Sequence, residues 1–152
     1  MSIVARLEET ALAPPEELAA LLASARGDGA VVSFTGVARA TSKDGVPLMH
    51  LVLDHHPVLT LQSLEAIAAE AAARPGVAHV RVVHRCGAIA SGEPIVFAGA
   101  ASRHRRAAFE AADYLMDRLK TDAVFWKREV GERGSTWIEP TEADYADRER
   151  WS

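Results

Sequence analysis

Two lysines near the end of the chain have surroundings that can give a lysine unusual chemistry. Lys120 follows an apolar-striped segment that ends at Leu119, and Lys127 comes directly after Phe125 and Trp126. Burial beside apolar groups disfavours the ammonium form, and a second ammonium nearby disfavours it further. The pKa of such a lysine falls toward neutrality, where it can act as a general acid, a base or a nucleophile. For either lysine alone, a helix-terminal cation or a strand residue reaching water is the simpler interpretation.

A basic segment, residues 102–106, lies ahead of the same apolar stripe. It reads Ser-Arg-His-Arg-Arg, and Ser102 is the expected N-cap of a helix. Cations in a first helical turn oppose the helix dipole and cost about a few tenths of a kcal/mol each when exposed. A bound anion would reverse that cost, because free backbone N–H groups at a helix start point toward such a ligand. The segment therefore indicates either an anion site or a solvated basic helix end.

Further basic residues follow apolar stretches. Arg39 enters a polar loop after residues 30–38, where its guanidinium could bind a phosphate through two hydrogen bonds or remain an exposed loop charge. His84 and Arg85 form a second basic pair in an apolar run. Strand alternation would turn one of the two toward the interior, which favours a structural role for the pair.

The sequence carries little sign of metal or nucleotide chemistry. Cys86 is the only cysteine, which excludes a disulfide framework and a thiolate cluster, and it is expected to be a packed core residue. The six histidines show no HExxH or paired CxxC spacing, so no metal site is predicted. Without a phosphate-binding glycine loop or a GxSxG elbow, nucleotide binding and serine hydrolysis lack support. No cofactor is predicted.

Composition describes an ordinary globular chain of 152 residues, 49% hydrophobic and 25% charged. A net charge of −4 argues against a general nucleic-acid binder. Seven bases nevertheless fall between residues 103 and 128, and a local basic cluster suits a small anionic ligand. No apolar run reaches the roughly 18 residues of a membrane span. The N-terminus lacks a signal-peptide pattern, so we expect the protein to stay in the cytoplasm.

Periodicity and turn residues predict the elements that must position these side chains. Strands are predicted over residues 3–8, 30–38, 47–55, 77–86, 94–101, 123–130 and 136–139. Helices are predicted over 14–26, 57–73 and 103–120. The strand over 30–38 should be buried, residues 39–46 should form a mobile loop, and the core stripe of the third helix should be Phe109, Ala112, Met116 and Leu119.

This order predicts a single α+β domain over residues 1–140, with a mixed, mostly antiparallel sheet and about three helices. The remaining residues, 141–152, form an acidic tail that we expect to be loosely ordered or docked on a partner.

Read in order, five segments resemble the catalytic (large) subunit family of molybdopterin synthase. They are residues 29–39 (GAVVSFTGVAR), 84–87 (HRCG), 102–109 (SRHRRAAF), 119–120 (LK) and 125–129 (FWKRE), with Trp137 after them. The resemblance extends from about residue 3 to about residue 139. Five segments in the right order and spacing make it highly specific.

The resemblance implies a hammerhead-like α/β fold and a homodimer. Each protomer would bind one small ubiquitin-like sulfur carrier, giving a heterotetramer. The thiocarboxylated glycine tail of the carrier would thread into a pocket of the large subunit. There, cyclic pyranopterin monophosphate would receive two sulfurs and become molybdopterin.

Matching the segments also implies roles for individual residues. Lys120 and Lys127 match the active-site lysines of the family. The matches to its substrate-contacting or pocket-lining positions are Arg39, His104, Arg105 and Phe34. Sulfur transfer from a thiocarboxylate needs cations near the developing charge. We hypothesise that Lys120 is the main acid/base group and that Lys127 orients the thiocarboxylate or the pterin.

The chain departs from the family pattern at three places. Residues 54–56 read Asp-His-His where the family usually has a Glu-Tyr type pair, and Val124 stands where it often has proline. Residues 139–141 contain no arginine, although a partner subunit can contribute a cation to the neighbouring site from there. Arg148 or Arg150 could take that place.

Two functions of other classes compete with the enzyme. A non-catalytic adaptor could bind a ubiquitin-like tail or a phosphorylated metabolite, and it would not need both lysines. A small RNA-binding domain could use the basic cluster, but net acidity and few exposed aromatic residues weigh against it.

Overall fold

The computed structural model describes all 152 residues, which form four helices and eight strands. The helices are α1 (Pro14–Ser24), α2 (Leu59–Ala72), α3 (Arg105–Asp122) and α4 (Glu142–Glu149). The strands are β1 (Ser2–Glu8), β2 (Ala30–Val37), β3 (His50–His55), β4 (Val77–Arg85), β5 (Gly87–Ala90), β6 (Pro94–Ser102), β7 (Phe125–Gly131) and β8 (Gly134–Ile138). None of the four helices combines the length and the apolar character needed to span a bilayer.

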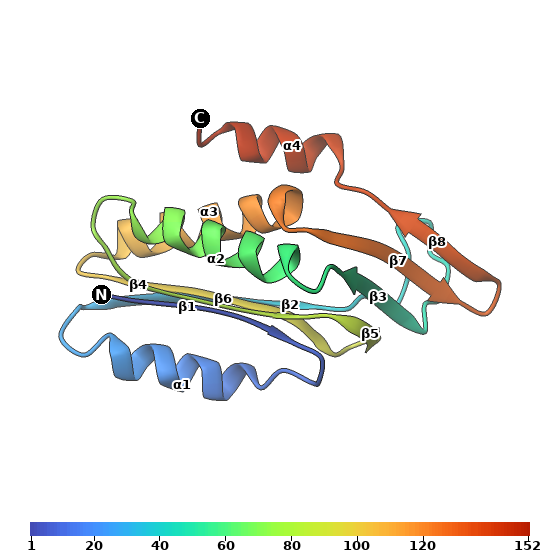
Figure 1. The fold of residues 1–152 in the computed structure, drawn as a ribbon, viewed down its shortest axis with the longest axis horizontal. Helices are drawn as coiled ribbons and strands as arrows, with labels where there is room; N and C mark the ends of the chain where they lie inside the picture. The colour runs from blue at the N-terminus through green and yellow to red at the C-terminus, as the bar shows by residue number, and fades with distance from the viewer.

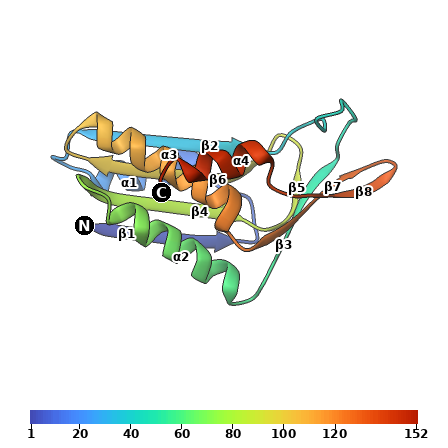
Figure 2. The same ribbon diagram turned by 90° about the horizontal axis from the view of Figure 1, so that it is seen from above.

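The strands divide into two four-stranded sheets. The first has the order β1-β4-β6-β2, in which β1 and β4 run parallel, and the second has the order β5-β3-β7-β8. Every pairing other than β1 with β4 is antiparallel. From β2 to β7 the chain alternates between the two sheets at every connection. The second sheet extends away from the helical layers (Figures 1 and 2). The predicted α+β class and mostly antiparallel pairing are therefore confirmed.

Helices cover both faces of the first sheet. Figure 1 shows α2 and α3 on one face and α1 on the other. Alternation along β4 explains how both faces become apolar, because Val82 packs toward α2 and α3 while Val83 packs toward α1. The larger core cluster includes Leu64 of α2 and Leu115 of α3, and both side chains are fully buried.

A buried carboxylate holds α1 against the sheet. The side chain of Glu17 is 9% exposed and accepts hydrogen bonds from Arg6 of β1 and Arg81 of β4. Burial alone would raise the pKa of the Glu17 carboxyl, but the two arginines outweigh it and keep the pKa below its usual value. The ionised carboxylate is thus the form that links the helix to two strands.

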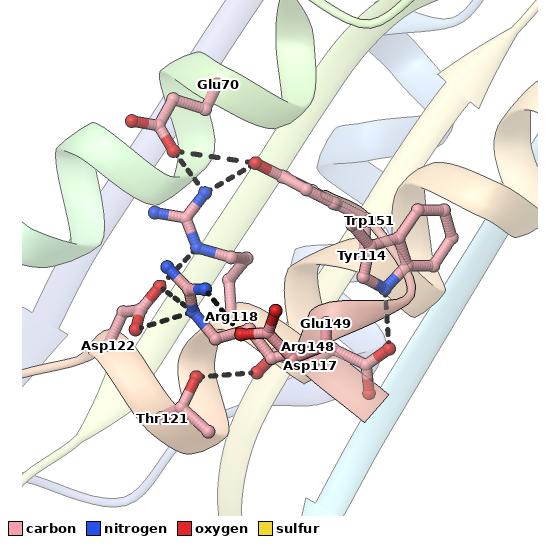
Figure 3. Close-up of polar contacts among 9 residues, drawn as sticks. All are labelled: Glu70, Tyr114, Asp117, Arg118, Thr121, Asp122, Arg148, Glu149 and Trp151. Atoms are coloured by element: carbon pink, nitrogen blue, oxygen red, sulfur yellow. Dashed lines mark hydrogen bonds and ion pairs between the residues drawn. The ribbon is translucent and has the colours of Figure 1, made fainter. Parts of the chain in front are cut away.

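The acidic tail forms α4, so the expectation of loose order was wrong, and the helix count is four instead of three. Thr141 caps the helix in a reciprocal pair of hydrogen bonds with Asp144. Arg148 Nε donates to Asp122 of α3 at 3.0 Å, and Trp151 Nε1 donates to Asp117 of α3 at 2.7 Å (Figure 3). The tail therefore docks on α3 within its own chain.

Three local expectations were also wrong. The strand over residues 30–38 is exposed over 33–35, because β2 is an edge strand and pairs only with β6. Phe109 is 60% exposed, since alanines at 108 and 111 form the buried stripe and let α3 approach the sheet closely. Ser102 is the last residue of β6 and fully buried, and its hydroxyl donates to the carbonyl of His104, which is the N-cap.

Candidate active site

A pocket of about 300 Å³ opens where the two sheets meet the end of α3. Both sheets contribute to its wall, together with the loop after β2 and the start of α4. The polar or aromatic side chains that line it include Phe34, Arg39, His84, Lys120, Lys127, Glu129 and Asp144. Four of the six predicted site residues, Phe34, Arg39, Lys120 and Lys127, thus line one pocket.

Lys127 is the pocket lysine whose pKa is strongly lowered. It lies on β7, paired with Leu53 of β3 on one side and Ile138 of β8 on the other. Burial lowers its pKa to about 8, and the charges of Lys120 and Arg39 add to that effect. Asp144 acts in the opposite direction and raises the pKa. Lys127 can therefore change its charge close to physiological pH.

Lys120 comes from the other side of the pocket. It lies in the last turn of α3, where a cation interacts favourably with the negative end of the helix dipole. Its side chain is exposed, and it lines both the main pocket and a neighbouring hollow. Lys127 also lines both, so the lysine pair stands at the boundary between two cavities.

The neighbouring hollow is rimmed by aromatic side chains. Trp126, Trp137 and Tyr145 line it, and each is more than half exposed. Trp126 lies on β7 and Trp137 on β8, which form the hairpin that extends from the second sheet (Figure 2). Exposed tryptophans of this kind are typical of surfaces that bind a partner.

Arg39 and Phe34 place a cation and an aromatic ring at the mouth of the main pocket. Arg39 is exposed in the loop that follows β2, and Phe34 is 45% exposed on β2. Arg39 forms no ion pair or side-chain hydrogen bond within the chain, in contrast to Arg85, which pairs with Glu93. Arg39 is thus available to an anionic ligand.

His104 and Arg105 lie outside this pocket. They occupy the N-terminal end of α3, and Lys120 occupies its C-terminal end. Lys120 lies fifteen residues after Arg105 along α3, which corresponds to a distance of roughly 22 Å. The basic segment is held against the start of β2, because a Cβ at Gly29 would lie 2.7 Å from the carbonyl oxygen of Arg103. A single chain therefore does not bring these two predicted site residues to the lysines.

Sequence reasoning assigned His84 a structural role, yet it lines the pocket. Both His84 and Arg85 are buried, whereas strand alternation predicted one. The ring of His84 packs on Phe125 with a centroid distance of 4.4 Å, and its Nδ1 lies 2.9 Å from the carbonyl oxygen of Arg85. Burial lowers the pKa of His84 to about 4, and the charge of Lys127 also lowers it. The ring is therefore neutral, and its contact with a carbonyl oxygen places the proton on Nδ1.

The proposed substitutes for a missing cation are already engaged. Arg148 binds Asp122, and Arg150 binds the carboxylates of Asp113 and Asp117. These ion pairs hold α4 on α3. Both guanidinium groups are therefore already bound within the chain and do not supply a cation to a neighbouring site. Asp144, which sequence reasoning also missed, is the residue of α4 that reaches the pocket, and its place in the Thr141 capping pattern was the available signal.

Cys86 is buried as expected, with 1% of its surface exposed. Burial raises the pKa of its thiol, so it has little thiolate character at neutral pH.

Comparison with known proteins identifies the family. The family model described as "MoaE protein" matches residues 7–122. The chain belongs to the MoaE family. It is 44% identical over 146 residues to the molybdopterin synthase catalytic subunit of Pseudomonas aeruginosa, covering 96% of this chain and 97% of that one.

Solved structures agree with this family assignment. The molybdopterin biosynthesis MoaE protein from Burkholderia ambifaria has a TM-score of 0.81 and 35% identity, covering 99% of this chain and 98% of that one. Molybdopterin synthase from Staphylococcus aureus has a TM-score of 0.78 and 27% identity, covering 88% and 96%. The resemblance seen in the sequence segments is confirmed.

Proposed function

We propose that this chain is the sulfur-transferring subunit of a molybdopterin synthase and works through the pocket shared by Lys120 and Lys127. The observation that carries the proposal is the placement of these two lysines, with Arg39, around one cavity in a chain of the MoaE family. The substrate is cyclic pyranopterin monophosphate, which becomes molybdopterin. The sulfur donor is the thiocarboxylated C-terminus of a small ubiquitin-like carrier, and the reaction takes place in the cytoplasm, as expected from the sequence.

The two lysines have different surroundings, and we assign them different roles. Lys127 is partly buried and close to other cations, so its ammonium is poorly solvated and gains most from an anionic partner. We assign it to orienting the thiocarboxylate or the pterin. Lys120 is exposed at the boundary of both cavities, where it can exchange protons with solvent, and we assign it the acid/base role.

The two adjoining cavities suit two different ligands. The main pocket, with Arg39 and Phe34 at its mouth, offers a guanidinium for the phosphate and an aromatic ring for the pterin. The neighbouring hollow, rimmed by Trp126 and Trp137, offers an apolar entry for the flexible tail of the carrier. Both ligands would then meet at the lysine pair.

His104 and Arg105 complete the site only if another chain supplies them. Because roughly 22 Å of helix separates them from Lys120, they cannot contact a substrate held by the lysines of the same chain. In the homodimer, the basic segment of one protomer would lie at the lysine pocket of its partner. The phosphate would then bind between chains, at a helix start whose N–H groups favour an anion.

Reconstitution tests this function. The purified chain is mixed with thiocarboxylated carrier and cyclic pyranopterin monophosphate, and molybdopterin is measured as its fluorescent oxidised derivative. We expect product from the wild type and a loss of about 100-fold or more for Lys120→Ala, the usual scale for removing a general acid or base. Arg26→Ala, which removes an exposed charge beyond the end of α1, is the matched control. Carrier binding without product would favour the adaptor, and full activity of Lys120→Ala would contradict the assigned role.

A further inference from the structure

Three residues far apart in the sequence converge at the junction of the two sheets. Glu9 follows β1, His55 is the last residue of β3, and Cys86 connects β4 to β5. The Cys86 sulfur, a ring nitrogen of His55 and a carboxylate oxygen of Glu9 all lie within 4.8 Å of one another. None of the three lines the main pocket or the neighbouring hollow.

The three side chains have no partners within the chain, although their immediate neighbours do. His56 accepts backbone hydrogen bonds at the start of α2 through its Nδ1, and Glu8 forms an ion pair with Arg6. The side chains of His55, Glu9 and Cys86 form no hydrogen bond or ion pair. Polar groups that converge without pairing to each other or to other residues are free to bind something else.

Their chemistry selects a class of ligand. A thiolate, an imidazole and a carboxylate are the donors that Zn²⁺ takes in proteins, at distances of about 2.0–2.3 Å in tetrahedral geometry. Such distances place the donors roughly 3.5 Å apart, so atoms that now lie up to 4.8 Å apart would have to approach by up to about 1.3 Å. Glu9 is exposed at the end of β1, where a carboxylate can move by that amount. Water would occupy the fourth position, as at zinc sites with three protein ligands.

We propose that Glu9, His55 and Cys86 form a binding site for one thiophilic divalent cation, with Zn²⁺ as the physiological occupant. Binding replaces the thiol proton with a metal–sulfur bond and releases that proton to solvent. The site needs no change of oxidation state and no second reactant. Sequence spacing gave no sign of it, because residues 9, 55 and 86 meet only through strand pairing.

A cation at this place would link the two sheets. Glu9 extends from the first sheet, His55 belongs to the second, and Cys86 lies where the chain crosses between them. His55 and Cys86 each lie two residues beyond a side chain of the pocket wall, Leu53 and His84 respectively. The ion would therefore hold the two halves of that wall at a fixed spacing.

Cobalt titration tests the proposal. The full-length, tag-free chain is freed of metal, kept reduced and titrated with Co²⁺ alone. We expect a thiolate-to-cobalt charge-transfer absorption that saturates at one ion per chain and disappears when Zn²⁺ is added. Cys86→Ser should abolish the band. His55→Gln and Glu9→Gln should each weaken binding by at least the roughly 10–100-fold that outer-shell changes cause.

Matched controls keep the test independent of folding and of catalysis. His50→Gln and Glu65→Gln change the same residue types elsewhere, and both should bind Co²⁺ like the wild type. Circular dichroism verifies that each variant is folded, and Zn²⁺ should raise the Tm of the wild type but not of His55→Gln. Absence of the charge-transfer band, or unchanged affinity in both His55→Gln and Glu9→Gln, would overturn the proposal. Neither result depends on whether the chain transfers sulfur.

Discussion

Lys127 shares its pocket with Lys120, and burial together with the neighbouring charge lowers the pKa of Lys127 to about 8. Asp144 of α4 lines the same pocket and moderates the effect by favouring the ammonium form. The pocket thus holds a lysine whose charge is present at neutral pH and is lost slightly above it. Binding of an anionic substrate that needs the Lys127 charge should therefore weaken when that charge is lost.

We predict that activity falls as pH rises through about 8, because deprotonation removes the Lys127 ammonium, to which we assign the orienting role. The value of kcat/KM, measured from pH 6 to pH 10 in the reconstituted assay, should decline roughly tenfold per pH unit above the pKa. Lys127→Arg should lose this decline, since a guanidinium stays charged. Lys43→Arg, outside the pocket, should keep it. A rate that rises through pH 8 would instead make neutral Lys127 the reactive form.

Two inactive variants should restore activity when mixed. Lys120→Ala and Arg105→Ala are each expected to be inactive, because each removes one half of every site in the shared arrangement proposed for the homodimer. In a mixed dimer one site combines both changes and the other has neither. Random exchange of protomers should therefore recover about a quarter of wild-type activity. Mixing Lys120→Ala with Lys127→Ala provides the control, since both lysines belong to the same half-site and nothing should be recovered.

Acid should destabilise the folded chain through His84. Its pKa is about 4 in the folded state and 6.5 in the unfolded chain, so below pH 6.5 the unfolded state binds the additional proton. The contribution of His84 to the free energy of unfolding should fall by about 3 kcal/mol as pH drops from 6.5 to 4. Urea unfolding at successive pH values measures this. His84→Gln should flatten the profile in that window, while His104→Gln, at an exposed ring, should leave it unchanged.

Docking of α4 should depend on Trp151. No residue of the helix itself is buried, and the indole of Trp151 packs edge-on against Tyr114 with a centroid distance of 5.5 Å. Trp151→Ala should cost about 2 kcal/mol, less than the roughly 3–5 kcal/mol of a fully buried aromatic residue. Tyr145→Ala, on the exposed side of α4, should change stability by less than about 0.5 kcal/mol. Equal losses for the two variants would contradict this picture.

Local patterns were sufficient to predict most elements. Proline at the start of α1, glycine after it, and the alternating apolar residues of β4 and β6 act within a few neighbouring residues, so they can be read from the sequence. The four residues of β5 carry no such pattern, because that strand is defined by its pairing with β3. The division of the strands into two sheets also depends on long-range pairing, which periodicity does not encode.

In the candidate site too, the features that depend on local sequence could be predicted, and those that depend on long-range contacts could not. Lys120 and Lys127 could be predicted because their surroundings are local, and family segments support both. His84 was undervalued, since a histidine in an apolar strand more often has only a structural role. The separation of Arg105 from the lysines was not foreseen, because segment matching says which residues act in a site and not which chain supplies them.

The fluorescence of the three tryptophans can report on partner binding and on detachment of α4 without an added label. Trp126 and Trp137 flank the hollow beside the lysines, whereas Trp151 reports on the contact between α4 and α3. A carrier tail that enters the hollow should change the fluorescence of the first two, and detachment of the tail helix should change that of the third. Single Trp→Phe variants would separate the signals, so partner binding and helix release could be timed independently by stopped-flow fluorescence.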